Sequence, residues 1–357
     1  MAEPTRVVSI GSVKIGGGNP IVVQSMTNTS TADAASTLRQ IRRLARAGCE
    51  VIRVAVPDEE SARVLPAIVS RSPVPVVADI HFDPKLALAA LAAGVHGLRL
   101  NPGNIRNQKA LREIIAAAAD RGVPIRVGVN SGSIARDVRE RHLDNMAEAL
   151  VASALEHVTL LEELKFTAIK ISLKASDVPA TVAAYRRMRA LRPYPLHLGI
   201  TESGTLFSGL VKSSAGLGIL LAEGIGDTIR YSLAADPVEE VRAGYALLRA
   251  LGLRRRGVEV IACPTCGRAR RDVAGAALAL EKKLAAVTAP LRIAVMGCGG
   301  NGPGEARLSD LGAVGTPKGI QVYLKGERMG TVAPEKLLDW MIRQARQLAA
   351  EMPPGSG

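Results

Sequence analysis

Short apolar segments alternate with longer amphipathic segments through the first 250 residues of the chain. The short segments are rich in Val, Ile and Leu and read as strands. The longer ones carry Ala, Leu and Arg with helical spacing, as at 34–47, 84–93 and 109–120. Gly48, Gly94 and Gly122 mark the ends of these helices. The predicted strands are residues 20–25, 50–56, 75–80, 97–102, 124–130, 168–173, 196–201 and 227–233.

Eight strand–helix repeats predict a (β/α)8 TIM barrel, which they match in number and in total length. A doubly wound sheet is the alternative, and it is less favoured because no glycine-rich dinucleotide turn follows the first strand. A run of three glycines, Gly16–Gly18, follows a short β-segment at 7–15. We interpret this run as a hairpin turn rather than a phosphate loop, because no helix follows it directly.

The pattern changes after Gly252, where three arginines at 254–256 and Gly257 mark a boundary. The sequence pattern beyond this boundary predicts a second, smaller α+β unit. We therefore expect a barrel domain at 1–252, a second domain at 258–351 and a disordered tail at 352–357. The second domain is expected to contain strands at 258–262 and 291–296, helices at 274–287 and 333–351, and a hairpin of 320–324 with 328–332.

The chain is basic, with 46 Lys and Arg against 33 Asp and Glu among 357 residues. This balance favours anionic partners such as phosphates. Nucleic acid is not expected, because the few aromatic residues do not interleave with a basic run to form a stacking platform. No apolar run is long enough for a membrane span. The first residues lack the features of an export signal, and four cysteines are too few for a disulfide framework, so a cytoplasmic protein is expected.

Polar residues gather toward the ends of the predicted strands, where barrel enzymes place their chemistry. Five basic residues interrupt apolar strands and are expected to point inward. A single buried arginine is best explained by an ion pair, but five with few inward acids predict a pocket for a polyanion. The candidate binding residues are Arg53, Arg99, Asn101, Arg126, Asn130, Lys170, Lys174, His197, Arg230 and Ser232.

We assign different roles to the acidic and histidine residues at the ends of the predicted strands. Asp79 and Glu202 are candidates for proton transfer. Asp83 precedes Pro84, so we expect it to cap a helix. His81 could act as an acid, a donor or a metal ligand, and so could His197; a hydrogen-bonded structural histidine is an equally good interpretation of either. Cys49, which opens the second strand, is interpreted as a buried apolar residue.

Three cysteines near the C-terminus predict a metal centre. Cys263 and Cys266 form a C-x-x-C pair, and Cys298 lies in a glycine-rich segment that ends in Glu305. A closed zinc site usually has four nitrogen or sulfur ligands, and no nearby histidine supplies the fourth. Three thiolates with a carboxylate or an open position fit an iron–sulfur cluster. A zinc knuckle remains the alternative.

Taken together, these segments resemble the bacterial 4-hydroxy-3-methylbut-2-enyl diphosphate synthases of the methylerythritol phosphate route to isoprenoids. The resemblance covers essentially the whole chain, and its motifs occur in the same order. The matching segments are 22–29 (VVQSMTNT), 78–82 (ADIHF), 99–105 (RLNPGNI), 126–133 (RVGVNSGS), 197–204 (HLGITESG), 263–268 (CPTCGR) and 296–306 (MGCGGNGPGEA).

The resemblance implies a TIM barrel followed by an iron–sulfur domain that holds a [4Fe-4S] cluster on Cys263, Cys266, Cys298 and Glu305. It implies reductive ring opening of 2-C-methyl-D-erythritol 2,4-cyclodiphosphate with loss of water, driven by electrons from ferredoxin or flavodoxin. Glu202 is the candidate proton donor, with Asp79 and His81 as further catalytic candidates. The resemblance also implies a homodimer in which the cluster domain of one subunit covers the barrel of the other.

Two other classes of function remain open on the residues alone. One is a non-redox phosphate- or pterin-binding barrel enzyme with a structural zinc. The other is a binding module whose zinc unit contacts nucleic acid. Iron and sulfide in anaerobically purified protein would distinguish the iron–sulfur enzyme from both.

Overall fold

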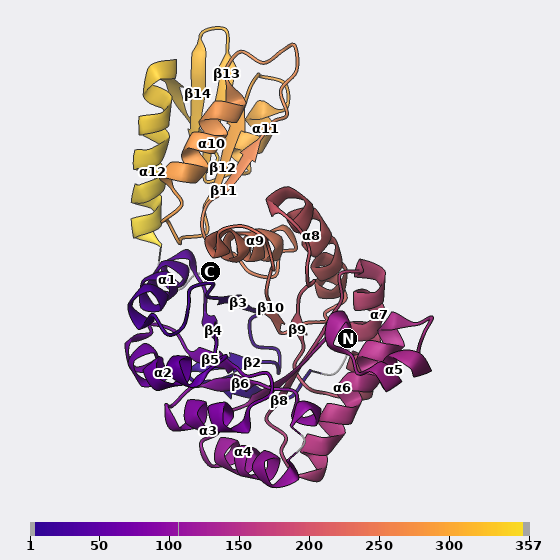
Figure 1. Cartoon of the computed structure of the whole chain (residues 1–357). Helices are drawn as coiled ribbons and strands as arrows, with labels where there is room; N and C mark the ends of the chain where they lie inside the picture. Colours follow the sequence, from indigo (N-terminus) through magenta and orange to yellow (C-terminus); the bar gives the residue numbers. More distant parts are fainter. Residues whose placement is uncertain (1–3, 106, 353–357) are drawn as a thin grey trace. The chain divides into compact units, whose positions relative to one another are not determined.

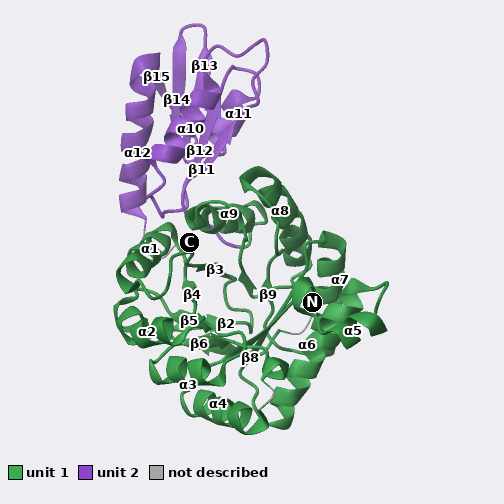
Figure 2. Ribbon diagram, in the orientation of Figure 1, with its two compact units in different colours: residues 1–253 green, residues 254–357 purple. Residues whose placement is uncertain are grey.

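The computed structural model describes residues 4–105 and 107–352. It divides into two compact units, Met1–Leu253 and Arg254–Gly357 (Figure 2). The division falls close to the arginine triplet at which the sequence pattern changes. Of the tail predicted at 352–357, Met352 follows the last helix, and residues 353–357 lie outside the described part of the chain.

The first unit is a barrel of eight parallel strands surrounded by helices (Figure 1). Its strands pair in the order β8-β7-β6-β5-β4-β3-β10-β9, and a parallel bridge between Ile171 and Leu196 joins β8 to β9 and closes the ring. The predicted TIM barrel is therefore confirmed. The strands are β3 (Val22–Met26), β4 (Val51–Ala55), β5 (Val76–Asp79), β6 (Gly97–Arg99), β7 (Ile125–Asn130), β8 (Ile169–Lys174), β9 (His197–Leu198) and β10 (Thr228–Ile229).

Asp and Asn side chains at the ends of the strand–helix loops begin most of the barrel helices. Each accepts a hydrogen bond from a backbone amide in the first turn, which satisfies donors that the helix leaves free. The predicted cap is confirmed, because Asp83 Oδ1 accepts from the Lys85 amide at 2.8 Å. The helices are α1 (Ala34–Ala47), α2 (Glu59–Arg71), α3 (Pro84–Ala92), α4 (Gln108–Asp120), α5 (Arg136–Arg141), α6 (Met146–Glu163), α7 (Val178–Leu191), α8 (Leu206–Ala222) and α9 (Pro237–Ala250).

A hairpin of β1 (Val8–Ile10) and β2 (Val13–Ile15) covers the N-terminal end of the barrel strands. Its isoleucines pack with Val22, Val51 and Val77, which begin or nearly begin their strands. The hairpin turn is Gly11–Ser12, so the turn predicted at Gly16–Gly18 was wrong: that run follows β2 and turns the chain toward β3. Because apolar side chains close this end, the opposite, C-terminal end of the strands is left for a site.

The second unit is a five-stranded sheet in the order β11-β12-β13-β14-β15. The strands β11 (Glu259–Ala262), β12 (Arg292–Met296) and β13 (Leu311–Thr316) are parallel, and β14 (Gly319–Leu324) and β15 (Glu327–Val332) continue antiparallel. The helices α10 (Val273–Lys283) and α12 (Leu337–Glu351) share one apolar core with the sheet, and α11 (Gly302–Arg307) belongs to another. Sequence reasoning missed β13 and α11, because their glycines resemble loop sequence.

Candidate functional site

Six basic side chains enter the interior of the barrel from five of its strands or strand ends. Arg53, Arg99, Arg126, Lys170 and Lys174 are each at most 9% exposed, and Arg230 directly follows β10. They point inward because residues on a strand alternate between its two faces. On β4, for example, Ile52 and Val54 pack in the main apolar core of the barrel, and Arg53 between them faces the opposite way.

Only two carboxylates form ion pairs with these cations among the described residues. Asp79 lies 3.6 Å from Arg53 Nε and 3.4 Å from Arg99. Glu240, which is 4% exposed on α9, lies 3.5 Å from Arg230 and also accepts hydrogen bonds from the Leu233 amide and the Ser25 hydroxyl. The interior therefore carries a clear excess of positive charge, as an anion-binding site requires.

Several buried polar nitrogens of this site have no hydrogen-bond partner within the described chain. They include Nε and one terminal nitrogen of Arg126, Nε of Arg99, and both ring nitrogens of His197. Burial, followed by the nearby Arg53 and Arg99, lowers the pKa of Arg126 well below its ordinary value. Buried donors usually have partners, so these groups fit a site prepared for a polar, negatively charged ligand.

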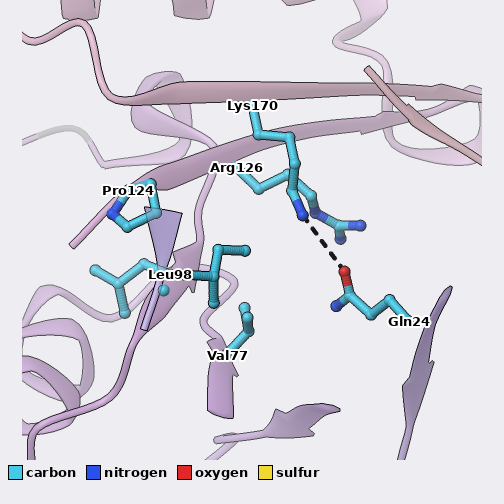
Figure 3. A pocket seen from close by; sticks show the side chains of 8 residues that line it. Gln24, Val77, Leu98, Pro124, Arg126 and Lys170 are labelled. Atoms are coloured by element: carbon cyan, nitrogen blue, oxygen red, sulfur yellow. Dashed lines mark hydrogen bonds between the residues drawn. The ribbon is translucent and has the colours of Figure 1, made fainter. Parts of the chain in front are cut away.

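Lys170 lies beside Arg126 in a small pocket that Ile10 of the N-terminal hairpin also lines (Figure 3). Lys170 Nζ donates to Gln24 Oε1 at 3.4 Å, and both line a cavity of about 10 Å³ with Val77, Leu98 and Arg126. This cavity has room for about one water molecule. Lys170 therefore has a hydrogen-bond partner within the protein, and Lys174 lies farther along the same strand, at the C-terminal end of β8.

The remaining predicted residues lie around the C-terminal rim of the barrel. Asp79 ends β5, and its pKa is lowered: burial alone would raise it, but Arg53, Arg99 and Arg126 together outweigh that effect. The largely exposed His81 ring lies within 3.8 Å of Asp79 and 3.3 Å of Arg99. Asn130 ends β7, and Ser232 follows β10, where its backbone oxygen accepts from the Ser203 hydroxyl.

Glu202 is exposed in the loop after β9 and has a backbone φ of +51°. Non-glycine residues seldom adopt this left-handed conformation, and such strain concentrates at functional sites. Within the described chain, Glu202 forms no ion pair with an Arg or Lys. The neighbouring loops are joined by Ser203, and Ala234 N donates to Gly204 O at 3.0 Å.

Several residues that shape this site were missed from the sequence. Met26 Sδ accepts from two nitrogens of Arg53, at 3.1 and 2.8 Å, and Glu240 and Gln24 hold Arg230 and Lys170. From the sequence, Glu240 resembles an ordinary acid in the first turn of a helix, and only the packing reveals its contact with Arg230.

Among the predicted residues, Asn101 has a structural contact: its Oδ1 accepts from the Gly128 amide at 2.9 Å, which indicates a role in holding β6 to β7.

Gly199, which directly follows β9, leaves space for the cations. A methyl group on Gly199 would lie 2.6 Å from Lys174 Nζ and 2.8 Å from the Arg230 backbone oxygen. We therefore expect Gly199→Ala to displace Lys174 or push β9 from the β10 strand end, costing about 1–3 kcal/mol of stability. Thermal unfolding checks this, with Gly218→Ala on α8 as the control: its methyl group would meet nothing closer than 3.8 Å. Equal melting temperatures of the Gly199→Ala protein and the wild type would contradict the expected close contact.

The C-terminal unit gathers the three candidate thiols at one edge of its sheet. Cys263 directly follows β11, and Cys298 follows β12, a neighbouring parallel strand. The Gly297 amide donates to Cys263 Sγ at 3.2 Å. Hydrogen bonds from the Arg268 backbone and side chain lower the pKa of Cys266, which favours the thiolate that binds a metal. Glu305 lies on α11, the helix that follows Cys298 in the sequence.

As they stand, the described side chains do not bring three or more Cys, His, Asp or Glu residues together closely enough to hold a metal. The donor set nevertheless fits an iron–sulfur cluster, because the thiols are unbridged and one already accepts a backbone N–H. Thr265, between Cys263 and Cys266, has φ +60°, a strained value for a β-branched residue. Cys49 is 2% exposed in the barrel, and burial raises the pKa of its thiol to about 12, which confirms it as a buried apolar residue.

A TIM barrel with a cationic interior, followed by an α+β unit that carries three cysteines, defines a two-domain class of barrel protein. The profile of the GcpE TIM-barrel domain matches residues 5–245, and that of the GcpE protein C-terminal domain matches residues 259–347. The chain therefore belongs to the GcpE family, whose members use an iron–sulfur cluster.

Curated relatives of the chain carry one enzyme name. A 4-hydroxy-3-methylbut-2-en-1-yl diphosphate synthase (flavodoxin) from Geobacter sulfurreducens is 52% identical over 351 residues, covering 98% of this chain and 99% of the relative. A protein of the same name from Caldanaerobacter subterraneus is 48% identical, again covering 98% of this chain and 99% of the relative. Chain and relatives thus match over nearly their whole lengths.

Solved structures with similar barrels are much more distant. Xanthomonas albilineans dihydropteroate synthase has a TM-score of 0.51 at 17% identity, covering 70% of this chain and 98% of that one. An N-acetylneuraminic acid synthetase from Leptospira borgpetersenii has a TM-score of 0.51 at 15% identity, covering 71% and 91%. Such likeness shows the barrel fold alone. The family match leaves the non-redox pterin- or phosphate-binding alternative unfavoured.

Proposed function

We propose that the barrel binds 2-C-methyl-D-erythritol 2,4-cyclodiphosphate and that the chain reduces it to 4-hydroxy-3-methylbut-2-enyl diphosphate. The chain is an oxidoreductase of isoprenoid biosynthesis, the activity named in its curated relatives. The reaction takes up two electrons and two protons, breaks the C–O bond that closes the diphosphate ring, and releases one water. The observation that supports this substrate most directly is the excess of buried, partly unpartnered cations in the barrel.

The diphosphate is the group that these cations fit. Arg126 and Arg99 present unpartnered N–H groups, and guanidinium forks match phosphate oxygens. Lys174 adds a charge at the end of β8, and Arg53 and Arg230 are held in place by Asp79 and Glu240. His197, whose pKa burial and then Lys174 lower well below the ordinary value, is neutral and can donate to one oxygen. Asn130 and Ser232 add hydrogen bonds at the rim.

Cys263, Cys266, Cys298 and Glu305 are the residues proposed to hold a [4Fe-4S] cluster. Bound there, the cluster supplies the two electrons one at a time. The protein contributes thiolates stabilised by N–H donors, and a carboxylate in place of a fourth thiolate.

The proton chemistry is assigned to the rim of the barrel. Glu202 is proposed to protonate the departing hydroxyl, because it forms no ion pair with any residue that the structure describes and is presented by a strained loop. Asp79 has a lowered pKa and two arginine partners, so it is better suited to positioning those arginines than to donating a proton. His81 lies beside Asp79 and Arg99 and can relay a proton at the rim.

The proposed partners follow from the same chemistry. Flavodoxin is the electron donor named in the relatives, and ferredoxin is an alternative donor of the same kind. No helix in the described residues could cross a membrane. Four free cysteines, of which Cys266 is exposed, favour a reducing cytoplasm. A homodimer, which would bring a cluster domain to a barrel mouth, is proposed from the family resemblance alone, and no nucleic-acid partner is proposed.

Arg126 provides a test in which stability and binding change in opposite directions. Arg126→Met removes a buried charge that pairs with no carboxylate in the part of the chain that the structure describes, so we expect the substrate-free protein to melt at a higher temperature. The same change should raise KM by roughly 10- to 150-fold, the loss of about 1.5–3 kcal/mol for a charged hydrogen bond. Arg255→Met, on an exposed residue between the units, is the control and should alter neither value. A lower melting temperature with an unchanged KM would contradict the binding role of Arg126.

The activity itself is tested with anaerobically purified protein. We expect iron and sulfide, and conversion of the cyclic diphosphate to the open-chain diphosphate when a chemical reductant such as dithionite is added. A protein that contains stoichiometric zinc, lacks sulfide and forms no product would overturn the proposed function.

A further inference from the structure

The edge of the C-terminal sheet that carries the thiols also carries basic side chains that form no ion pair with a carboxylate among the described residues. Because β11, β12 and β13 are parallel, their carboxyl ends meet at one edge, together with the turn from β13 to β14. We call this the thiol edge and define it by residues 263–272, 297–301 and 316–319. Its exposed basic residues are Arg268, Arg270, Arg271 and Lys318.

Backbone hydrogen bonds and close contacts fix these arginines beside the cysteine loops. Arg270 N donates to the Gly297 backbone oxygen at 2.8 Å, which joins the two cysteine loops. Arg271 donates to the Arg270 backbone oxygen at 3.0 Å, and its stem lies 3.3 Å from where a methyl group on Gly315 would be. A hydrogen bond joins the Arg268 side chain to Cys266.

The acids available at this edge do not neutralise it. Asp272 accepts from the Gly275 amide at 2.9 Å and caps α10, and no ion pair joins Asp272 or Glu305 to the four basic residues within the described chain. At the opposite edge of the same sheet, two basic residues are paired with carboxylates. Arg292 lies 3.7 Å from Glu259, and Lys325 lies 3.2 Å from Glu351. These four basic residues therefore place positive charge that no carboxylate pairs directly beside the thiols.

We infer that the thiol edge is the docking surface for the flavodoxin, which binds there through an acidic face. This inference rests on the proposed function, in which the electrons enter through the group that the thiols hold. Charge complementarity favours this partner, because exposed and unpaired cations steer an acidic protein to its site and are screened by salt. Docking at this edge brings the donor next to the cysteines, and electron transfer requires that proximity.

Charge reversal at two positions tests the surface without touching a residue that contacts a thiol. Arg270→Glu with Lys318→Glu changes the thiol edge by four charges and leaves Arg268 in place. The control is Arg343→Glu with Arg346→Glu, which makes the same change on the exposed face of α12. Dissociation constants are measured by calorimetric titration of the full-length, cluster-containing enzyme with oxidised flavodoxin at about 50 and 300 mM salt. Dithionite-driven turnover is measured in parallel.

The thiol-edge variant is expected to bind flavodoxin about 10-fold more weakly at low salt and to lose most of the salt dependence seen in the wild type. The α12 variant should bind like the wild type, and all three proteins should turn over with dithionite within about twofold. Equal weakening in both variants, or unchanged binding at the thiol edge, overturns the inference. So does loss of dithionite-driven turnover in the thiol-edge variant alone, because the edge would then serve the cluster and not the donor. A wild type that binds flavodoxin but makes no product with dithionite refutes the proposed function instead.

Discussion

Cys298→Ser is expected to lose most of its iron and all measurable turnover. Cys298 lies in the loop after β12, at the same sheet edge as Cys263 and Cys266, and serine is a far poorer ligand for iron than a thiolate. We expect the same result for Cys263→Ser and Cys266→Ser. Iron and sulfide analysis with the visible absorption spectrum of anaerobically purified protein checks it.

Cys49→Ser is the matched control for these variants. Cys49 is buried in the barrel, and its thiol donates to the Val51 backbone oxygen at 3.1 Å, a bond that a hydroxyl can replace. This variant should keep its iron, its spectrum and its turnover. If Cys298→Ser retained full iron, the ligand assignment would be wrong.

Glu202→Gln is expected to slow the chemical step by about 10²–10⁴-fold, the usual contribution of a general acid. The amide is nearly the same size as the carboxyl group but cannot donate the proton that the leaving hydroxyl needs. Because Glu202 is exposed and forms no ion pair in the described chain, the change should leave the melting temperature, the cluster spectrum and substrate binding nearly unaltered. Single-turnover kinetics under a chemical reductant measures the step directly.

Glu223→Gln provides the comparison for that variant. Glu223 is an exposed carboxylate at the end of α8 that pairs with Arg186, so its replacement should affect stability slightly and the rate not at all. If Glu202→Gln instead lowered the melting temperature and left kcat near the wild-type value, Glu202 would serve as a structural residue.

The same measurements should distinguish the role of Glu305 as a cluster ligand from the role of Glu202 as a proton donor. Glu305→Ala is expected to alter the spectrum or the stability of the cluster in the absence of substrate, because Glu305 is the proposed fourth ligand. A normal spectrum for Glu305→Ala would remove it from the ligand set.

The architecture of the barrel could be predicted from the sequence because local signals agreed along the chain. Apolar runs alternated with helical spacing, and Asp or Asn at the strand–helix junctions capped the helices, as at Asp83. The two elements that escaped prediction, β13 and α11, contain glycines and form only because neighbouring elements pack against them. Their existence depends on tertiary contacts that a local pattern does not contain.

The sequence by itself also determined which chemistry the chain carries: cations on strands, a C-x-x-C pair with a distant third cysteine, and acids at strand ends. Only the tertiary structure decided which of these groups pair with one another and which have no partner. It paired Asp79 with Arg53 and Arg99, joined Lys170 to Gln24, and brought Glu240 from α9 to Arg230. Among the described residues, it left two nitrogens of Arg126 and the ring nitrogens of His197 without a hydrogen-bond partner. It also separated the paired cations of one sheet edge from the unpaired cations beside the thiols. The physical reason is that a charge acquires its role from the groups within a few ångströms of it, and these come from distant parts of the chain.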